Sequence, residues 1–379
     1  MSSYEYEEID PILSYLKKDV LPEDNKQFPK GTVCSDGRLD MCKQSLGVAG
    51  CKLTSDALKN NHTIHSLLLG TNGIGNKGAE QVAELIKETK ALKTVYLGCN
   101  YIENEGCSKL AKSLWGNKTV KGLWLKRNPV GLEGTKYLGE MLLNNVHLTT
   151  LDLFGTSIGD QGVKIIVDSL IKAKDTSSLE RLYFGGNRLT TETGHYIADL
   201  LKNYKKLDSI FLNVNFIGNE GVKVIAESLK ENDTLNEIGL ASNGINVVGL
   251  GYILTALEKH PSVTRLDLGR SISEKVYNVN PNDFDNKKCY EILINFLKSN
   301  PKIVSLTYTK CNYKYFNHMY LLTEAMKSNT NLSEFLGLGL PKSILSILEK
   351  NKKENSHMFE IPEDIANIIS VYRTAKKIY

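Results

Sequence analysis

The chain has 379 residues, of which 41% are hydrophobic and 24% are charged, and its formal net charge is +4. This composition is typical of a folded globular protein and excludes a disordered or collagen-like chain. The small positive charge is spread along the sequence, so nucleic acid is not the expected partner. The sequence shows neither a long apolar run typical of a membrane span nor a signal-peptide pattern, and we therefore expect a cytoplasmic protein.

Residues 1–30 are predicted to form a short helical cap. Ile12, Leu13, Leu16 and Val20 follow an acidic start at helical spacing. An open end of a repeat array exposes its core, so a cap is expected before the repeats that follow.

A pattern of about 28 residues then recurs through residues 31–340. The segment from Ile64 to Asn72 reads IHSLLLGTN, and the segment from Leu92 to Asn100 repeats its pattern as LKTVYLGCN. A degenerate unit near Leu39 begins the series, which gives about eleven units in all. The later units open at Val120, Leu148, Leu179, Leu207, Leu235, Val263, Ile303 and Leu332.

Each unit predicts a strand, a turn and a helix. The two apolar residues of LxL point to the same side of an extended strand, because side chains alternate with period two. A buried asparagine can then satisfy backbone groups of adjacent turns, and apolar residues at i, i+3, i+4 and i+7 predict the helix. The fold class is therefore α/β, with a parallel sheet on the concave side of a horseshoe-shaped solenoid and helices on the convex side. The asparagines are Asn72, Asn100, Asn128, Asn187, Asn215 and Asn243.

Two segments depart from the pattern. Residues 271–288 lengthen one repeat by 12 and place Ser271 where asparagine is expected; either Tyr277 and Phe284 reach a partner, or the insertion is neutral. Residues 341–379 lose the LxL signature and predict a C-terminal cap of two helices. The second helix starts near Pro362 and carries Ile365, Ile368, Ile369 and Tyr372 on one face.

Cysteines and glycosylation sequons indicate structural roles. The seven cysteines are scattered, without a CxxC pair or histidines at metal-ligand spacing, and we expect buried thiols and no metal. Sequons begin at Asn61, Asn117, Asn232 and Asn331. Three of them recur where a repeat helix leads into the next strand, and we interpret them as turn residues.

With its period and its LxL and asparagine positions, the sequence resembles leucine-rich repeats of the ribonuclease-inhibitor-like subclass, as found in NOD-like receptors and the Ran GTPase-activating protein. The resemblance covers roughly residues 39–340. It implies a ligand on the concave sheet or its rim. The chain is also similar in overall look to effectors that bacteria such as Legionella deliver into host cells, which would place it in the host cytosol.

The middle strand positions predict a partner-binding stripe on the concave face. A column of exposed aromatic and apolar side chains usually marks an interaction site, although such residues can instead stiffen the sheet by packing across strands. Farther along, Glu237 lies near Arg265, Asp267 and Arg270 in a charged region, which is either a specificity region or a solvated face. The predicted partner-binding residues are Leu68, Tyr96, Trp124, Asp152, Phe154, Arg181, Tyr183, Phe211, Arg265, Asp267 and Arg270.

No catalytic set emerges: the GxxxxGK[ST] and HExxH patterns are missing from the sequence. We therefore predict a monomeric protein-binding scaffold with no catalytic residue and no cofactor. One alternative is GTPase activation by rim residues such as Arg127, Asn128, Asn187 and Arg188. The other is a self-associating structural protein, which is disfavoured because concave faces pair poorly with themselves.

Overall fold

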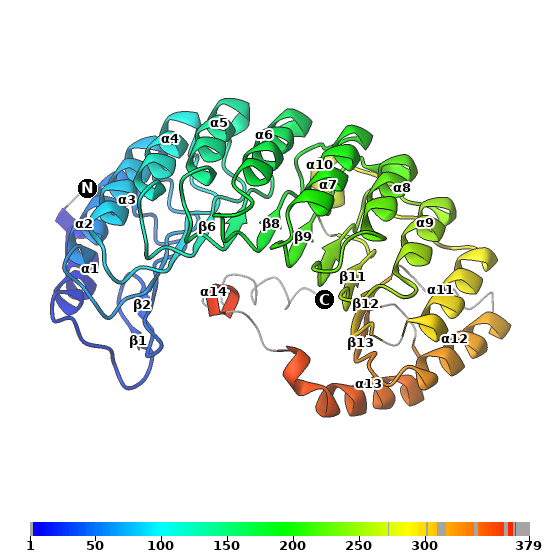
Figure 1. Ribbon diagram of the computed structural model, residues 1–379. Coiled ribbons are helices and arrows are strands. Elements are labelled where there is room, and N and C mark those ends of the chain that lie inside the picture. Colours follow the sequence, from blue (N-terminus) through cyan, green and yellow to red (C-terminus); the bar gives the residue numbers. More distant parts are fainter. Residues whose placement is uncertain are drawn as a thin grey trace. The chain divides into compact units, whose positions relative to one another are not determined.

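The computed structural model describes residues 3–271, 273–300, 302–308, 316–336, 340–359, 363–366 and 368. The chain divides into two compact units. The first comprises residues 1–158, 168–179 and 361–379, and the second comprises residues 159–167 and 180–360. In each unit, three-residue parallel strands alternate with helices, and the helices lie on one side of the strands (Figure 1). The predicted α/β repeat fold is confirmed. We call the side of the strands opposite the helices the open face.

The first unit begins with a helix and a pair of very short strands, and then alternates strand and helix. Its elements are α1 (Ser3–Leu16), β1 (Lys26–Gln27), β2 (Thr32–Val33), β3 (Arg38–Asp40), α2 (Gly47–Leu58), β4 (Ser66–Leu68), α3 (Gly75–Glu88), β5 (Thr94–Tyr96), α4 (Asn104–Leu114), β6 (Gly122–Trp124), α5 (Gly131–Leu142), β7 (Thr150–Asp152) and α14 (Glu363–Ala366). Helix α6 (Gly159–Lys172) has residues in both units.

The second unit continues the alternation. Its elements are β8 (Arg181–Tyr183), α7 (Thr191–Asn203), β9 (Ser209–Phe211), α8 (Gly218–Leu229), β10 (Glu237–Gly239), α9 (Val247–Leu257), β11 (Arg265–Asp267), α10 (Glu274–Tyr277), α11 (Lys287–Ser299), β12 (Ser305–Thr307), α12 (Phe316–Ser328), β13 (Glu334–Leu336), α13 (Lys342–Glu354) and the 3-10 helix η2 (Ser356–Phe359). Within the described ranges, no helix combines the length and apolar character needed to cross a membrane.

The strands pair in the register that the LxL pattern predicts. Leu67 pairs with Val95, and Val95 pairs with Leu123, and all three side chains are fully buried on the helix side. The middle residue of each LxL strand points to the opposite side, and these middle residues form a column on the open face.

The N-terminal cap is larger than predicted. Helix α1 buries Ile12, Leu13 and Leu16, but Val20 is 50% exposed and lies outside the helix. Strands β1 and β2 form an antiparallel pair, and β2 pairs with β3, which opens the parallel series. This hairpin covers the edge of the first repeat, which otherwise would present unpaired backbone groups.

Buried asparagines join each repeat to the one before it. The Asn128 side-chain amide donates to the carbonyl oxygens of Leu97 (2.9 Å) and Leu125 (2.8 Å). Its Oδ1 accepts from the backbone N–H groups of Asn100 (2.9 Å) and Ile102 (3.0 Å). One side chain thus satisfies four backbone groups in two successive turns, where water does not reach. The predicted role of the repeat asparagines is confirmed at this position.

In the lengthened repeat, Asn282 and not Ser271 occupies the position of the repeat asparagine. The Asn282 amide donates to Leu240 (3.1 Å) and Leu268 (2.9 Å), and its Oδ1 accepts from Asn243 and Ile245 at 3.0 Å each. The extra residues therefore precede the asparagine. The sequence interpretation placed the break at Ser271 because it assumed the regular spacing.

A second series of polar side chains ties each helix end to the preceding repeat. Asn117 donates to Ile86 O (2.8 Å) and accepts from Val120 N, and Asn232 donates to Leu201 O (2.9 Å). His260 takes the same place, with Nε2 3.1 Å from Leu229 O. The sequon asparagines Asn61, Asn117 and Asn232 are thus turn residues, as predicted, and Asn61 and Asn232 are buried.

Helices begin at both C-terminal positions where the sequence predicts them. Helix α13 follows β13 and buries Ile344 and Leu348. Helix α14 has four described residues, and Ile368 packs against Leu68, Tyr96 and Trp124 within the first unit. Ile365 and Ile368 of this segment thus pack on the open face of early repeats. Ile369 and Tyr372 lie outside the described residues.

Replacing Asn282 by alanine should destabilise the fold by about 2–4 kcal/mol, because two backbone N–H groups and the Leu268 carbonyl lose their buried partner. The matched control is Asn280→Ala, which removes an exposed asparagine from the same insertion. Urea unfolding followed by circular dichroism measures both changes. Equal stability of the two variants would contradict the structural role of Asn282.

Candidate functional site

The open face of the first unit carries a compact apolar cluster. Leu68, Tyr96 and Trp124 lie in register on β4, β5 and β6, and Ile368 packs on them from the C-terminal segment. Cys42 and Ile365 pack against its edge. We call these six residues the apolar cluster. Leu68, Trp124 and Ile368 are fully buried and Tyr96 is 4% exposed.

Glycines allow the aromatic rings to lie against the sheet. A Cβ atom at Gly122 would be 2.2 Å from the Trp124 ring, and a Cβ at Gly70 would be 2.5 Å from the Tyr96 ring. These distances are shorter than any real contact, so side chains at these positions would lift the rings. The two glycines therefore shape a flat surface for an apolar segment.

The apolar cluster contains one unsatisfied polar group. Trp124 Nε1 is buried and has no hydrogen-bond partner among the residues that the structure describes. Burial also raises the pKa of the Cys42 thiol and of the Tyr96 hydroxyl far above their usual ranges, so both stay neutral. The cluster thus offers apolar surface and one hydrogen-bond donor.

Charged residues flank the apolar cluster at β7. Asp152, 1% exposed, continues the column from Trp124, and its Oδ1 accepts from the backbone N–H of Phe154 (2.8 Å). Lys126 Nζ lies 5.5 Å and the Arg127 guanidinium 6.0 Å from the centre of the Phe154 ring. Burial lowers the pKa of Lys126, and the nearby Asp152 carboxylate opposes that shift. One edge of the cluster is therefore cationic and aromatic.

The prediction that Leu68, Tyr96 and Trp124 form an exposed stripe is wrong, because the C-terminal segment covers them. Sequence reasoning identified both apolar surfaces but not their contact. The apolar character that both surfaces share was the sequence signal for this contact.

In the second unit, Tyr183 and Phe211 form a separate aromatic pair. Their rings stack at 4.4 Å between centroids and 9° between planes, and both side chains are partly exposed. Arg181 is 8% exposed and forms an ion pair with Glu180 (3.1 Å). Cross-strand stacking, the alternative considered for the aromatic column, is thus present at this pair.

The predicted charged region lies on β10 and β11. Arg265 donates a hydrogen bond to the carbonyl oxygen of Met358, and its guanidinium lies 5.0 Å from the centre of the Phe359 ring. Asp267 accepts from Asn213 Nδ2 (3.1 Å), and burial raises its pKa. Burial also raises the pKa of Glu237 to about 7, which Arg265 opposes and Asp208, Asp267 and Glu334 reinforce. The region is therefore covered in part by η2 and is not an open solvated face.

Arg270 does not join that region, because its guanidinium pairs with Glu274 of the insertion at 2.7 Å. Phe284 is 2% exposed and stacks on Tyr308 (5.0 Å), so the hypothesis that it reaches a partner is wrong. Tyr277 is partly exposed.

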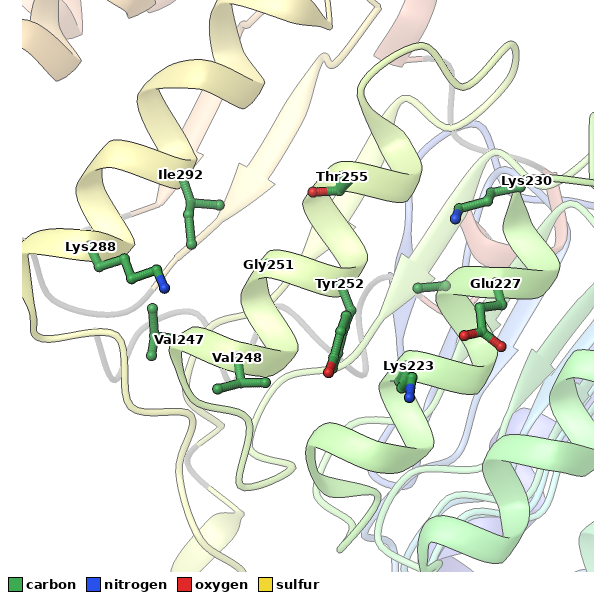
Figure 2. Close-up of a pocket in the computed structure, with 11 residues that line it drawn as sticks. Lys223, Glu227, Lys230, Val247, Val248, Gly251, Tyr252, Thr255, Lys288 and Ile292 are labelled. Atoms are coloured by element: carbon green, nitrogen blue, oxygen red, sulfur yellow. The ribbon is translucent and has the colours of Figure 1, made fainter.

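A surface hollow of about 550 Å³ lies on the helix side of the second unit, between α8, α9 and α11. Figure 2 shows Tyr252 and Val248 on α9 with Lys223 of α8 and Lys288 of α11 around them. Lys223 Nζ lies 5.8 Å from the centre of the Tyr252 ring. Sequence reasoning missed this hollow, whose lining combines apolar residues of α9 with Lys223, Lys230 and Lys288.

The structure weakens the rim proposed for GTPase activation. Asn128 is fully buried and Asn187 is 1% exposed, and both are bonded to backbone groups of their turns. Neither amide is available to a GTPase. Arg127 and Arg188 are both exposed.

The Glu237→Gln variant should gain stability relative to the natural chain as pH rises from about 4.5 to about 7. The unfolded chain ionises this carboxyl near 4.5 and the folded chain near 7, so folding is disfavoured progressively across that interval by Glu237 and not by glutamine. Below the interval the difference between the two chains should be constant.

Urea unfolding at half-unit pH steps measures this difference, with Glu231→Gln as a control that removes a carboxylate whose side chain is 67% exposed. A pH-independent difference for Glu237→Gln would show that this carboxyl is not buried in an unfavourable setting.

Comparison with known proteins supports the repeat fold. A family model described as Leucine Rich repeat matches residues 60–83, 91–111 and 144–167. Among solved structures, the chain is similar to "Leiomodin-1 Actin-Binding Site 2 (ABS2)" at 13% identity and a TM-score of 0.27, with 60% of this chain and 92% of that chain covered. It is also similar to the tropomodulin C-terminal domain of Caenorhabditis elegans at 21% identity and a TM-score of 0.32, with 41% and 92% covered.

No curated protein matches the chain in sequence. The two structural likenesses are too weak to carry an argument about function. The matched segments coincide with strand and helix pairs, namely β4 with α3, β5 with α4 and β7 with α6. The chain therefore contains leucine-rich repeats, and its fold is the α/β solenoid that such repeats build.

Proposed function

We propose that the protein is a non-enzymatic scaffold that binds a protein partner on the open face of its first unit. Leucine-rich repeats commonly serve as binding scaffolds, and function on such a fold depends on a local site. The observation that carries the proposal is the apolar cluster itself: a Leu, a Tyr and a Trp in register on the face opposite the helices, with an unsatisfied indole N–H.

The composition of this surface matches that of interaction hot spots. Trp and Tyr anchors in desolvated positions contribute most of the binding energy at protein interfaces, and a surrounding rim excludes water. Phe154, Lys126 and Arg127 form such a rim beside Trp124. Cytosolic location, a bacterial effector origin and a monomeric state remain predictions from the sequence.

Truncation of Trp124 tests the proposal. In Trp124→Ala, partner affinity should fall at least about thirtyfold, since loss of a central aromatic anchor costs about 2 kcal/mol or more. The full-length chain is immobilised, exposed to eukaryotic cytosol, and the bound proteins are quantified by mass spectrometry. Trp115→Ala is the matched control, because Trp115 lies at the end of α4 and is 46% exposed.

A protein captured by the natural chain and by Trp115→Ala, but lost from a folded Trp124→Ala, supports the proposal. Should the alanine variant fail to fold, Trp124→Phe retains a ring and removes the indole N–H. Identical capture by every folded variant would refute binding through the apolar cluster.

A further inference from the structure

The C-terminal segment places two isoleucines on the apolar cluster. Ile365 lies in α14, and the backbone N–H of Ile368 donates to Ile365 O at 3.1 Å, so the turn continues to Ile368. Residues three apart in such a turn share one side. Ile368 is fully buried on Leu68, Tyr96 and Trp124, and Ile365 packs at the edge.

The spacing of these isoleucines matches the spacing of the strands beneath them. Three residues of a helical turn rise about 4.5 Å along its axis. Adjacent strands lie about 4.8 Å apart. Two aliphatic side chains on one side of a turn therefore fit neighbouring strands of the open face.

The segment is an imperfect occupant. With Ile368 packed in the cluster, Trp124 Nε1 is buried without a hydrogen-bond acceptor among the described residues, and an unsatisfied buried donor is unfavourable. The repeats themselves are held by the buried asparagines and by the leucines on the helix side. The segment can therefore leave the open face while the repeats stay folded.

We propose, resting on the function proposed above, that the apolar cluster binds a partner segment that resembles this occupant. The partner segment is a helical turn with two aliphatic side chains three residues apart and an oxygen that accepts from Trp124 Nε1. The chain's own Ile365 and Ile368 hold the site until such a segment displaces them. Because the internal segment is tethered, its effective concentration is high and lowers the apparent affinity for a competitor.

The test uses the full-length chain carrying Trp115→Phe, which leaves Trp124 as its single tryptophan. The double substitution Ile365→Asp and Ile368→Asp should release the internal segment. Leu345→Asp, at a 46% exposed position of α13, is the matched control. A fluorescent peptide that copies residues 360–372 is the probe, and the same peptide with both aspartates is its control.

Acrylamide quenching of Trp124 should increase in the double variant and not in Leu345→Asp. The peptide should bind the double variant at least about tenfold more tightly than the natural chain, and its binding should restore the shielding of Trp124. The aspartate peptide should not bind. A milder Ile368→Ala chain should show the same direction of change if the double variant does not fold.

Three results would overturn the proposal. Trp124 could stay shielded in the double variant, the peptide could bind both chains equally, or light scattering could show that a second copy of the chain fills the released site as a dimer. Loss of peptide binding together with intact Trp124-dependent capture would refute this inference alone. Peptide binding without any Trp124-dependent capture would refute the proposed partner and leave the internal contact established.

Discussion

The repeat asparagine is the interaction on which the rest of the structure depends. Each short strand ends in a turn whose backbone groups point into the interior, and one amide such as that of Asn128 satisfies four of them in two successive turns. Without that amide the turns would bury unpaired N–H and C=O groups, at about 1–3 kcal/mol each. The need to pair these backbone groups keeps successive repeats at a constant spacing. The residues of the open face therefore lie in regular columns.

The open face differs from an ordinary solvated sheet because its middle column is apolar over β4, β5 and β6. Gly122 and Gly70 leave room for the Trp124 and Tyr96 rings to lie flat. The flat surface accepts aliphatic side chains, and Ile368 supplies one. The site is thus built from the same repeat that builds the fold, and only the residue types in one column distinguish it.

The sequence was sufficient for the strands, because period two and the LxL spacing leave one register in which Leu67, Val95 and Leu123 are buried together. The sequence did not predict the hairpin of β1 and β2, because strands of two residues are too short to show an alternating pattern. The position of Asn282 was missed because pattern matching assumes constant length, whereas the fold requires an amide at one place in space.

The contact between Ile368 and Trp124 was beyond reach for a different reason. The sequence patterns of both segments indicate apolar surfaces, but they do not specify which distant surfaces contact each other. The predicted column does hold apolar residues at Leu68, Tyr96 and Trp124, but these residues are buried and not exposed. Residue type therefore located the surface, and only the three-dimensional chain path revealed its occupant.

In the lengthened repeat, the asparagine side chain keeps its position in space although more residues precede it. Between β11 and Asn282 the chain makes a detour through α10, yet the amide bonds to Leu240 and Leu268 as its counterparts do in regular units. The segment between β11 and Asn282 therefore tolerates extra residues. A loop or reporter peptide inserted there should leave the packing of the neighbouring repeats unchanged.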